Sequence, residues 1–207
     1  MEIYWLARDL NKVPFGRHQF IVIITGKVSR TFKLQKSNQT IVTRDLGKGY
    51  GLVLGAHNVP PSNQNKPAKF NRLMFKAFEK ADLAAAKEFL TSSKPSGHAF
   101  WENYKPAEAK HVHPKQGYTA EQLARQILDA IDHYIINEKN TNIAYPPPWL
   151  GKNSNSWASS IMDVVPAKLA PNASDFKGAD AAHDVRIPAM YFTGICSPCT
   201  IQNPAHR

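Results

Sequence analysis

Residues 151–157, Gly-Lys-Asn-Ser-Asn-Ser-Trp, decide the fold expected for this chain, because they lead into a short helix with one apolar side. Pro166 ends the helical pattern, since proline lacks the backbone N–H that a helix interior requires. Ser154 therefore lies at a predicted helix N-terminus, where unpaired N–H groups and the helix dipole favour negative charge. This position suits a nucleophile, and it equally suits capping by Asn and Ser side chains. The apolar residues at helical spacing are Trp157, Ile161, Val164 and Val165.

A second segment, residues 15–24, is typical of a buried strand and reads Phe-Gly-Arg-His-Gln-Phe-Ile-Val-Ile-Ile. Large apolar residues occupy both even and odd positions after Gln19, as expected when both faces of a strand are covered. His18 is the polar residue at the entrance of this strand. It is either a structural or surface histidine, or the base that a nucleophile needs.

Together the two segments resemble the circularly permuted papain-like hydrolases, relatives of the NlpC/P60 cell-wall peptidases and of the lecithin:retinol acyltransferase group. In that pattern a histidine opens a buried strand near the N-terminus, and Asn-Cys-x-x-aromatic starts a helix near the C-terminus. The matching residues here are His18 and residues 153–157, and residues 51–58 resemble the strand between them in toxin-associated members. The resemblance covers residues 15–165 by order of elements. It implies an α+β fold with an antiparallel sheet packed against helices, one of which bears the nucleophile.

The chain departs from this family at one position, because the family nucleophile is a cysteine and Ser154 stands in its place. The protein is a natural serine variant, a degenerate member that binds without cleaving, or an engineered Cys→Ser form. A thiol is appreciably ionised near neutral pH, whereas a hydroxyl needs an aligned base to take its proton. If Ser154 attacks a carbonyl, His18 must lie within hydrogen-bond reach of its Oγ.

The resemblance also implies the other members of the site. His18 takes the proton of Ser154, and the backbone N–H of Ser154 stabilises the oxyanion. A third polar group orients the imidazole. The candidates for this group are Asp45, His57 and Asn58, of which the resemblance favours His57 and Asn58. Ser156 is a rival nucleophile that the family alignment places off the line of attack. The expected catalytic residues are Ser154, His18, His57 and Asn58, with Asn153 and Asn155 as oxyanion or positioning residues.

The 207 residues suit a single domain, 1–207, with a core at 15–165, an irregular insertion at 91–118 and an extension at 166–207. No apolar run approaches the ~20 residues that span a membrane, and the first residues do not resemble a Sec signal peptide. Residues 1–14 are expected to be a lead-in and 166–185 a surface loop. The expected strands are 18–25, 39–45, 50–57, 70–78 and 186–195, and the further expected helices are 80–90 and 119–137.

The formal net charge is +10, and the basic residues are scattered along the chain. No nucleic-acid partner is expected, because no known nucleic-acid-binding signature is visible. No metal ligand and no cofactor are expected either, although His111 and His113 would point to the same side of an extended segment. Cys196 and Cys199 are interpreted as a local disulfide or as two free thiols.

The expected function is hydrolysis of an amide bond in a peptidoglycan stem peptide, or of an acyl bond in a phospholipid. Resemblance to toxin-associated members implies an antibacterial effector of a type VI secretion system, with a secretion carrier and a cognate immunity protein. Such a protein would be made in the cytoplasm without a Sec signal and delivered to the periplasm of a target cell. The alternatives are an inactive module that binds cell wall or lipid, and a metal-dependent nuclease.

Overall fold

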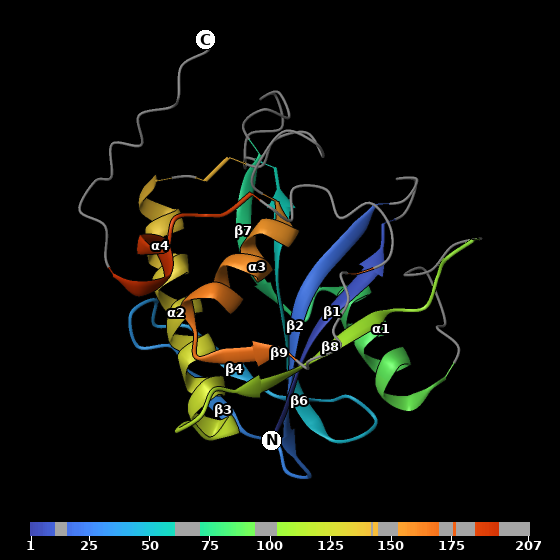
Figure 1. Ribbon diagram of the computed structural model, residues 1–207. Helices are drawn as coiled ribbons and strands as arrows, with labels where there is room; N and C mark the ends of the chain where they lie inside the picture. The colour runs from blue at the N-terminus through green and yellow to red at the C-terminus, as the bar shows by residue number, and fades with distance from the viewer. Residues whose placement is uncertain are drawn as a thin grey trace.

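The computed structural model describes residues 1–10, 16–60, 71–93, 103–141, 143–144, 153–169, 176 and 185–194. These residues form an α+β fold, in which helices cover both faces of a seven-stranded antiparallel sheet (Figure 1). The strand order is β5-β6-β2-β1-β8-β9, and β7 also pairs with β6, while β3 and β4 form a separate hairpin. The strands are β1 (Glu2–Asp9), β2 (Arg17–Gly26), β3 (Thr31–Lys33), β4 (Thr40–Val42), β5 (Arg44–Asp45), β6 (Tyr50–Val59), β7 (Arg72–Ala77), β8 (Glu108–Pro114) and β9 (Ala167–Leu169). The helices are α1 (Lys80–Thr91), α2 (Ala120–Thr141), α3 (Ser154–Val164) and α4 (Met190–Thr193).

Strand β2 lies at the centre of the sheet and is buried on both faces, as its apolar sequence predicts. It pairs with β1 along its length, from Glu2↔Ile24 to Asp9↔Arg17. Its pairing with β6 is shorter and runs from Ile21↔Leu54 to Gly26↔Tyr50. The first residues of β2 therefore have a strand partner on one side only, and this is where His18 lies.

The two faces of the sheet bury two separate hydrophobic clusters. On one face, odd-numbered residues of β2 such as Ile21 and Ile23 pack with α2, α3 and α4, and Trp157 is fully buried there. On the other face, even-numbered residues such as Phe20 and Val22 pack with α1. Because successive side chains of a strand point to opposite faces, His18 lies on the α1 face.

Several expected elements differ in the structure. The expected lead-in 1–14 contains β1, and the expected insertion 91–118 contains β8, which pairs with β1. The single strand expected at 39–45 is divided into β4 and β5, and the expected loop at 166–185 begins with β9. The strand expected at 186–195 is wrong, because the described part of that segment contains the short helix α4.

Helix α4 forms because its aromatic residues pack on α2 rather than on a neighbouring strand. Phe192 stacks on Tyr134 with ring centroids 5.3 Å apart. The Asn137 side chain donates hydrogen bonds to the carbonyls of Tyr191 and Gly194. Helix α2 itself begins at the expected capping box: Gln122 N donates to Thr119 Oγ1, and Thr119 N donates to Gln122 Oε1.

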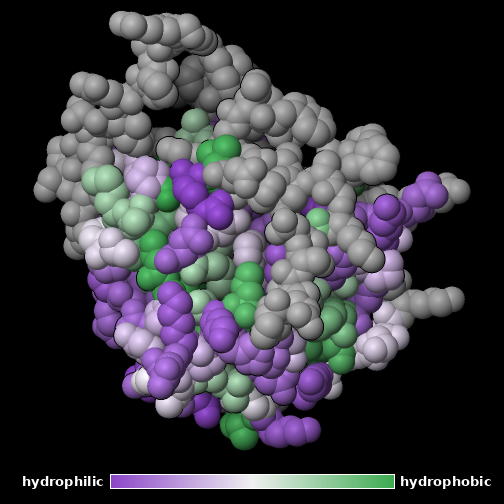
Figure 2. Space-filling model, in the orientation of Figure 1, coloured by the Kyte–Doolittle hydropathy of each residue, from purple (hydrophilic) through white to green (hydrophobic). Residues whose placement is uncertain are grey.

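Hydrophilic and hydrophobic residues alternate over the face of the molecule seen in Figure 2. None of the described helices is long and apolar enough to cross a membrane. The exposed large hydrophobic residues belong to separate segments of the chain, among them Val28, Val42, Tyr118 and Met190.

Candidate functional site

A buried carboxylate contacted by two imidazoles lies on the α1 face of the sheet. Asp82, in the first turn of α1, has its Oδ2 atom 3.0 Å from His18 Nε2 and 2.9 Å from His57 Nε2. His18 comes from β2 and His57 from β6, and continuing the register of these strands places the two opposite each other. Their ring centroids are 4.5 Å apart. Three elements that are distant in sequence thus meet at one oxygen atom.

Arg8 of β1 holds the other oxygen of this carboxylate. Its Nε atom donates to Asp82 Oδ1 at 2.7 Å, and both side chains are buried. Arg8 also lies 3.7 Å from Glu79, whose side chain accepts from the first backbone N–H groups of α1. The guanidinium compensates the buried carboxylate and fixes its orientation, so that Oδ2 faces the imidazoles.

The charges of this cluster follow from its burial and its partners. The pKa of His18 is lowered to about 4, mainly by burial; Asp82 acts to raise it, whereas His57 and Arg8 act in the same direction as burial. Burial alone would raise the pKa of Asp82, but His18, Arg8 and His57 hold it well below its usual range. At neutral pH the cluster therefore contains an ionised Asp82 and a neutral His18. The hydrogen bond to the carboxylate then places the His18 proton on Nε2 and leaves a lone pair on Nδ1.

The N-terminus of α3 is attached to β2 on both sides of His18. Asn155 Nδ2 donates to the carbonyl of Arg17 at 3.1 Å, and Asn155 Oδ1 accepts from the backbone N–H of Gln19 at 3.0 Å. These backbone groups lie where β2 has no pairing with β6. A side-chain amide therefore takes the hydrogen bonds that a neighbouring strand would otherwise supply.

Ser154 is buried at the first position of α3, as the sequence predicts. Its Oγ donates to Asn155 Oδ1 at 3.3 Å, the same atom that accepts from Gln19 N. Two successive hydrogen bonds thus connect the Ser154 hydroxyl to the backbone directly after His18. The expected hydrogen bond between Ser154 Oγ and the His18 imidazole is not formed among the described residues. Ser154 Oγ is bonded to Asn155 instead, and α3 packs on the face of the sheet opposite to His18.

Comparison with known proteins finds no similar protein. No family model, curated protein or solved structure matches this chain. The assignment of the site therefore depends on its own geometry.

Several expected site residues have other roles in the structure. Asn58 is exposed on β6 and, by strand alternation, faces away from His57, so it does not join the cluster. Asp45 is exposed and accepts from Gly47 N in a turn. Ser156 Oγ accepts from Asn153 N in the capping box of α3, which gives this rival nucleophile a structural role.

The two asparagines expected at the oxyanion hold the start of α3 in place. Asn153 is the N-cap of α3, and its Oδ1 accepts from the N–H groups of Asn155 and Ser156. Both polar atoms of the Asn155 side chain are bonded to β2. The backbone N–H of Ser154 remains the expected oxyanion donor.

Sequence reasoning missed Asp82 and Arg8. Asp82 lies at the start of the helix expected at 80–90, a position where acidic side chains are common. Its distance of 64 positions from His18 gives no local signal of their contact. The strand that carries Arg8 was itself not expected.

The other residues considered at the sequence level lie apart from this cluster. His111 and His113 stack on each other on β8, with ring centroids 4.1 Å apart, and His111 also stacks on Tyr4. Cys196 and Cys199 lie outside the described residues.

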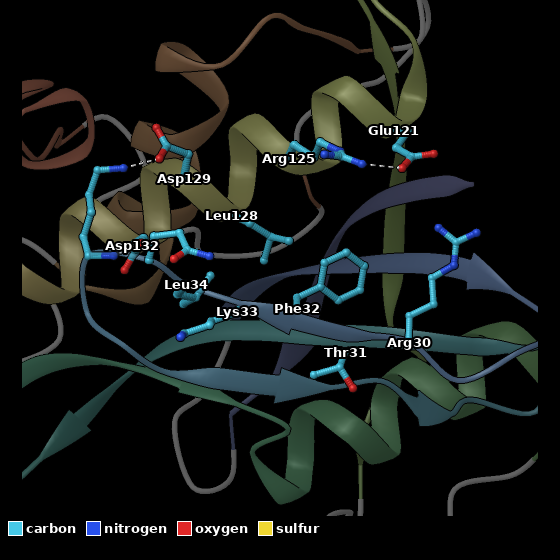
Figure 3. Close-up of a pocket in the computed structure, with 12 residues that line it drawn as sticks. Arg30, Thr31, Phe32, Lys33, Leu34, Glu121, Arg125, Leu128, Asp129 and Asp132 are labelled. Atoms are coloured by element: carbon cyan, nitrogen blue, oxygen red, sulfur yellow. Dashed lines mark hydrogen bonds and ion pairs between the residues drawn. The ribbon is translucent and has the colours of Figure 1, made fainter.

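A groove of about 690 Å³ lies between the β3 segment and α2. Phe32 and Leu128 approach each other across it, and Arg125 pairs there with Glu121 (Figure 3). Lys36 pairs with Asp129 at its rim. The groove contains none of the residues of the Asp82 cluster.

Proposed function

We propose that this chain is a hydrolase in which Ser154 attacks a carbonyl carbon and His18 takes the Ser154 proton. The single observation that carries the proposal is the attachment of α3 to β2 through Asn155, which brings the start of the helix to the His18 backbone. A hydroxyl at a helix N-terminus and a buried imidazole–carboxylate pair are the components of nucleophilic acyl transfer. Their arrangement on a β-strand and a later helix supports a permuted papain-like fold.

In the proposed reaction the Ser154 hydroxyl leaves Asn155 Oδ1 and reaches His18 Nδ1 past the end of the β2–β6 pairing, because α3 and His18 lie on opposite faces of the sheet. The proton passes to Nδ1 as the Oγ–carbon bond forms, and the backbone N–H of Ser154 stabilises the oxyanion. His18 then returns the proton to the leaving amine or alcohol, and an acyl-enzyme remains. Water hydrolyses the acyl-enzyme, again with His18 as base. Hydrogen bonds of this kind often form only when substrate binds.

Asp82 holds the imidazole in the required tautomer throughout this reaction. Its ionised carboxylate accepts from His18 Nε2 and stabilises the imidazolium that forms during attack. Arg8 keeps the carboxylate ionised and oriented. In this proposal Asp82 replaces Asn58 as the orienting group, and His57 contacts the same carboxylate.

The resemblance to cell-wall peptidases and acyltransferases supports two substrate classes, peptidoglycan stem peptides and phospholipids. An antibacterial effector that reaches the target-cell periplasm through a type VI secretion system, with an immunity protein, fits either substrate. An inactive module that binds wall or lipid is the second candidate, because Ser154 replaces the family cysteine.

Replacing Ser154 with Cys tests the proposal. We expect hydrolysis to increase at least tenfold, because a thiolate forms more readily than an alkoxide. Purified sacculi and phospholipid vesicles are incubated with each protein, and the products are identified by mass spectrometry.

The matched control is Ser156→Cys, which places a thiol two positions away at a residue that caps the helix. This variant should gain no activity, and Ser154→Ala should have none. Equal gains in the two cysteine variants would remove Ser154 as the nucleophile. If none of these proteins releases a product, the result would favour the binding module.

A further inference from the structure

Asp82 Oδ2 lies at the spacing of metal ligands from both histidine nitrogens of the cluster. His18 Nε2 and His57 Nε2 lie 3.0 and 2.9 Å from Asp82 Oδ2, and the three atoms lie within 4.8 Å of one another. Ligand atoms bound about 2.0–2.1 Å from one Zn²⁺ ion are about 2.8–3.0 Å apart at octahedral angles and about 3.3–3.4 Å apart at tetrahedral angles. Two imidazoles and a carboxylate are also a ligand set that divalent transition metals prefer.

The second observation concerns His57. Its Nε2 atom is buried 2.9 Å from Asp82 Oδ2, in a contact that does not have the geometry of a good hydrogen bond. An imidazole lone pair and a carboxylate oxygen that face each other at this distance repel unless a proton or a cation lies between them. A bound cation would satisfy both atoms.

Gly55 provides the room beside these atoms. A Cβ atom at this position would lie 2.8 Å from both Asp82 Oδ2 and His57 Nε2. Arg8, on the other carboxylate oxygen, supplies the outer contact that orients a metal ligand. The glycine and the arginine together leave Oδ2 accessible to the two imidazoles.

We propose that His18, His57 and Asp82 bind a divalent transition-metal ion such as Zn²⁺, and that this ion inhibits the hydrolase. The inhibition rests on the proposed function, whereas the binding does not. A metal ion on His18 Nε2 uses the lone pair of that nitrogen, so the proton of the neutral ring moves to Nδ1. Nδ1 can then no longer accept the proton of Ser154, and attack stops.

The experiment measures Zn²⁺ binding to the whole chain by isothermal titration calorimetry after treatment with EDTA. Co²⁺ absorption spectra report whether the ligands include nitrogen in a tetrahedral site. One ion should bind per chain, and binding should weaken at least tenfold in His57→Gln and in Gly55→Ala. Circular dichroism and thermal unfolding show whether each variant is folded, and His57→Gln remains decisive if Gly55→Ala is not.

Two control variants remove metal-binding side chains outside the Asp82 cluster. A His111→Gln/His113→Gln variant and a Cys196→Ser/Cys199→Ser variant should bind Zn²⁺ as the wild type does. Loss of binding in either control, or unchanged binding in His57→Gln, would overturn the proposed metal site.

Hydrolysis assays with added Zn²⁺ or EDTA separate this inference from the proposed function. Inhibition by Zn²⁺ that is relieved by EDTA and reduced in His57→Gln supports both the metal site and the hydrolase. Binding without any hydrolysis leaves the metal site in place and contradicts the hydrolase. Activation by Zn²⁺ would overturn the inhibition and would favour a metal-dependent hydrolase or nuclease.

Discussion

Asp82→Asn should lower the rate of hydrolysis by about 10³–10⁴-fold, the loss typical of a carboxylate that orients a catalytic imidazole. The asparagine amide has nearly the same shape, but it cannot stabilise the imidazolium that forms when Ser154 is deprotonated. The variant should also lose about 3–5 kcal/mol of unfolding free energy, because Arg8 is left buried without its principal counter-charge. The loss should be near the lower end of this range, because Glu79 lies 3.7 Å from Arg8 and remains as a partial counter-charge.

The two effects can be measured separately. Urea denaturation gives the free energy of unfolding, and mass spectrometry of the products gives the rate. The double variant Arg8→Met/Asp82→Asn removes the uncompensated charge, so it should recover stability without recovering activity. Asp129→Asn, which breaks an exposed ion pair with Lys36, is the matched control and should change stability by less than about 1 kcal/mol. Wild-type activity in Asp82→Asn would exclude a role for this carboxylate in the reaction.

Asn155→Asp should destabilise the protein by about 2–4 kcal/mol and abolish hydrolysis, although the two side chains have the same size. The aspartate oxygen that replaces Nδ2 would face the carbonyl oxygen of Arg17, which is an acceptor facing an acceptor. The buried negative charge adds to this cost. The start of α3 would then move away from β2 and carry Ser154 with it.

The same substitution two positions earlier is the control for this effect. Asn153→Asp should cost far less, because aspartate is as good an N-cap residue as asparagine. Thermal unfolding of both variants, followed by circular dichroism, compares them under one condition. Equal destabilisation of the two variants would show that the contact of Asn155 with β2 has no special importance.

The sequence predicted the parts of the fold whose signal is local. The apolar run of β2, the start of α3 and the capping box of α2 all lie within short windows, and the structure confirms them. Strands β1 and β8 were missed. The polar residues of β8 hide the pattern of a strand, whereas β1 contains the apolar residues 3–7 within the segment expected to be a lead-in. Lys110, for example, lies with its ammonium 5.0 Å from the centre of the Trp5 ring, on a strand that the sequence presents as irregular.

The candidate site was predictable only in part for the same reason. His18 and His57 open or end apolar strands, and this position marks them as candidates. No local pattern identifies Asp82, because its role depends on the packing of α1 against β2 and β6. Asn155 was correctly placed at a helix start, but its bonds to β2 depend on the end of the β2–β6 pairing, which no local pattern reports.

The contact of Asn155 with β2 also determines the order in which the parts of the site assemble during synthesis. The chain leaves the ribosome from its N-terminus, and β1, β2, β6 and α1 are all complete long before residue 155 is made. Until then the backbone beside His18 has donors and acceptors without their final partner. A nascent chain therefore carries the histidines and the carboxylate early, but the proposed nucleophile joins them last, so the proposed reaction becomes possible only when α3 docks.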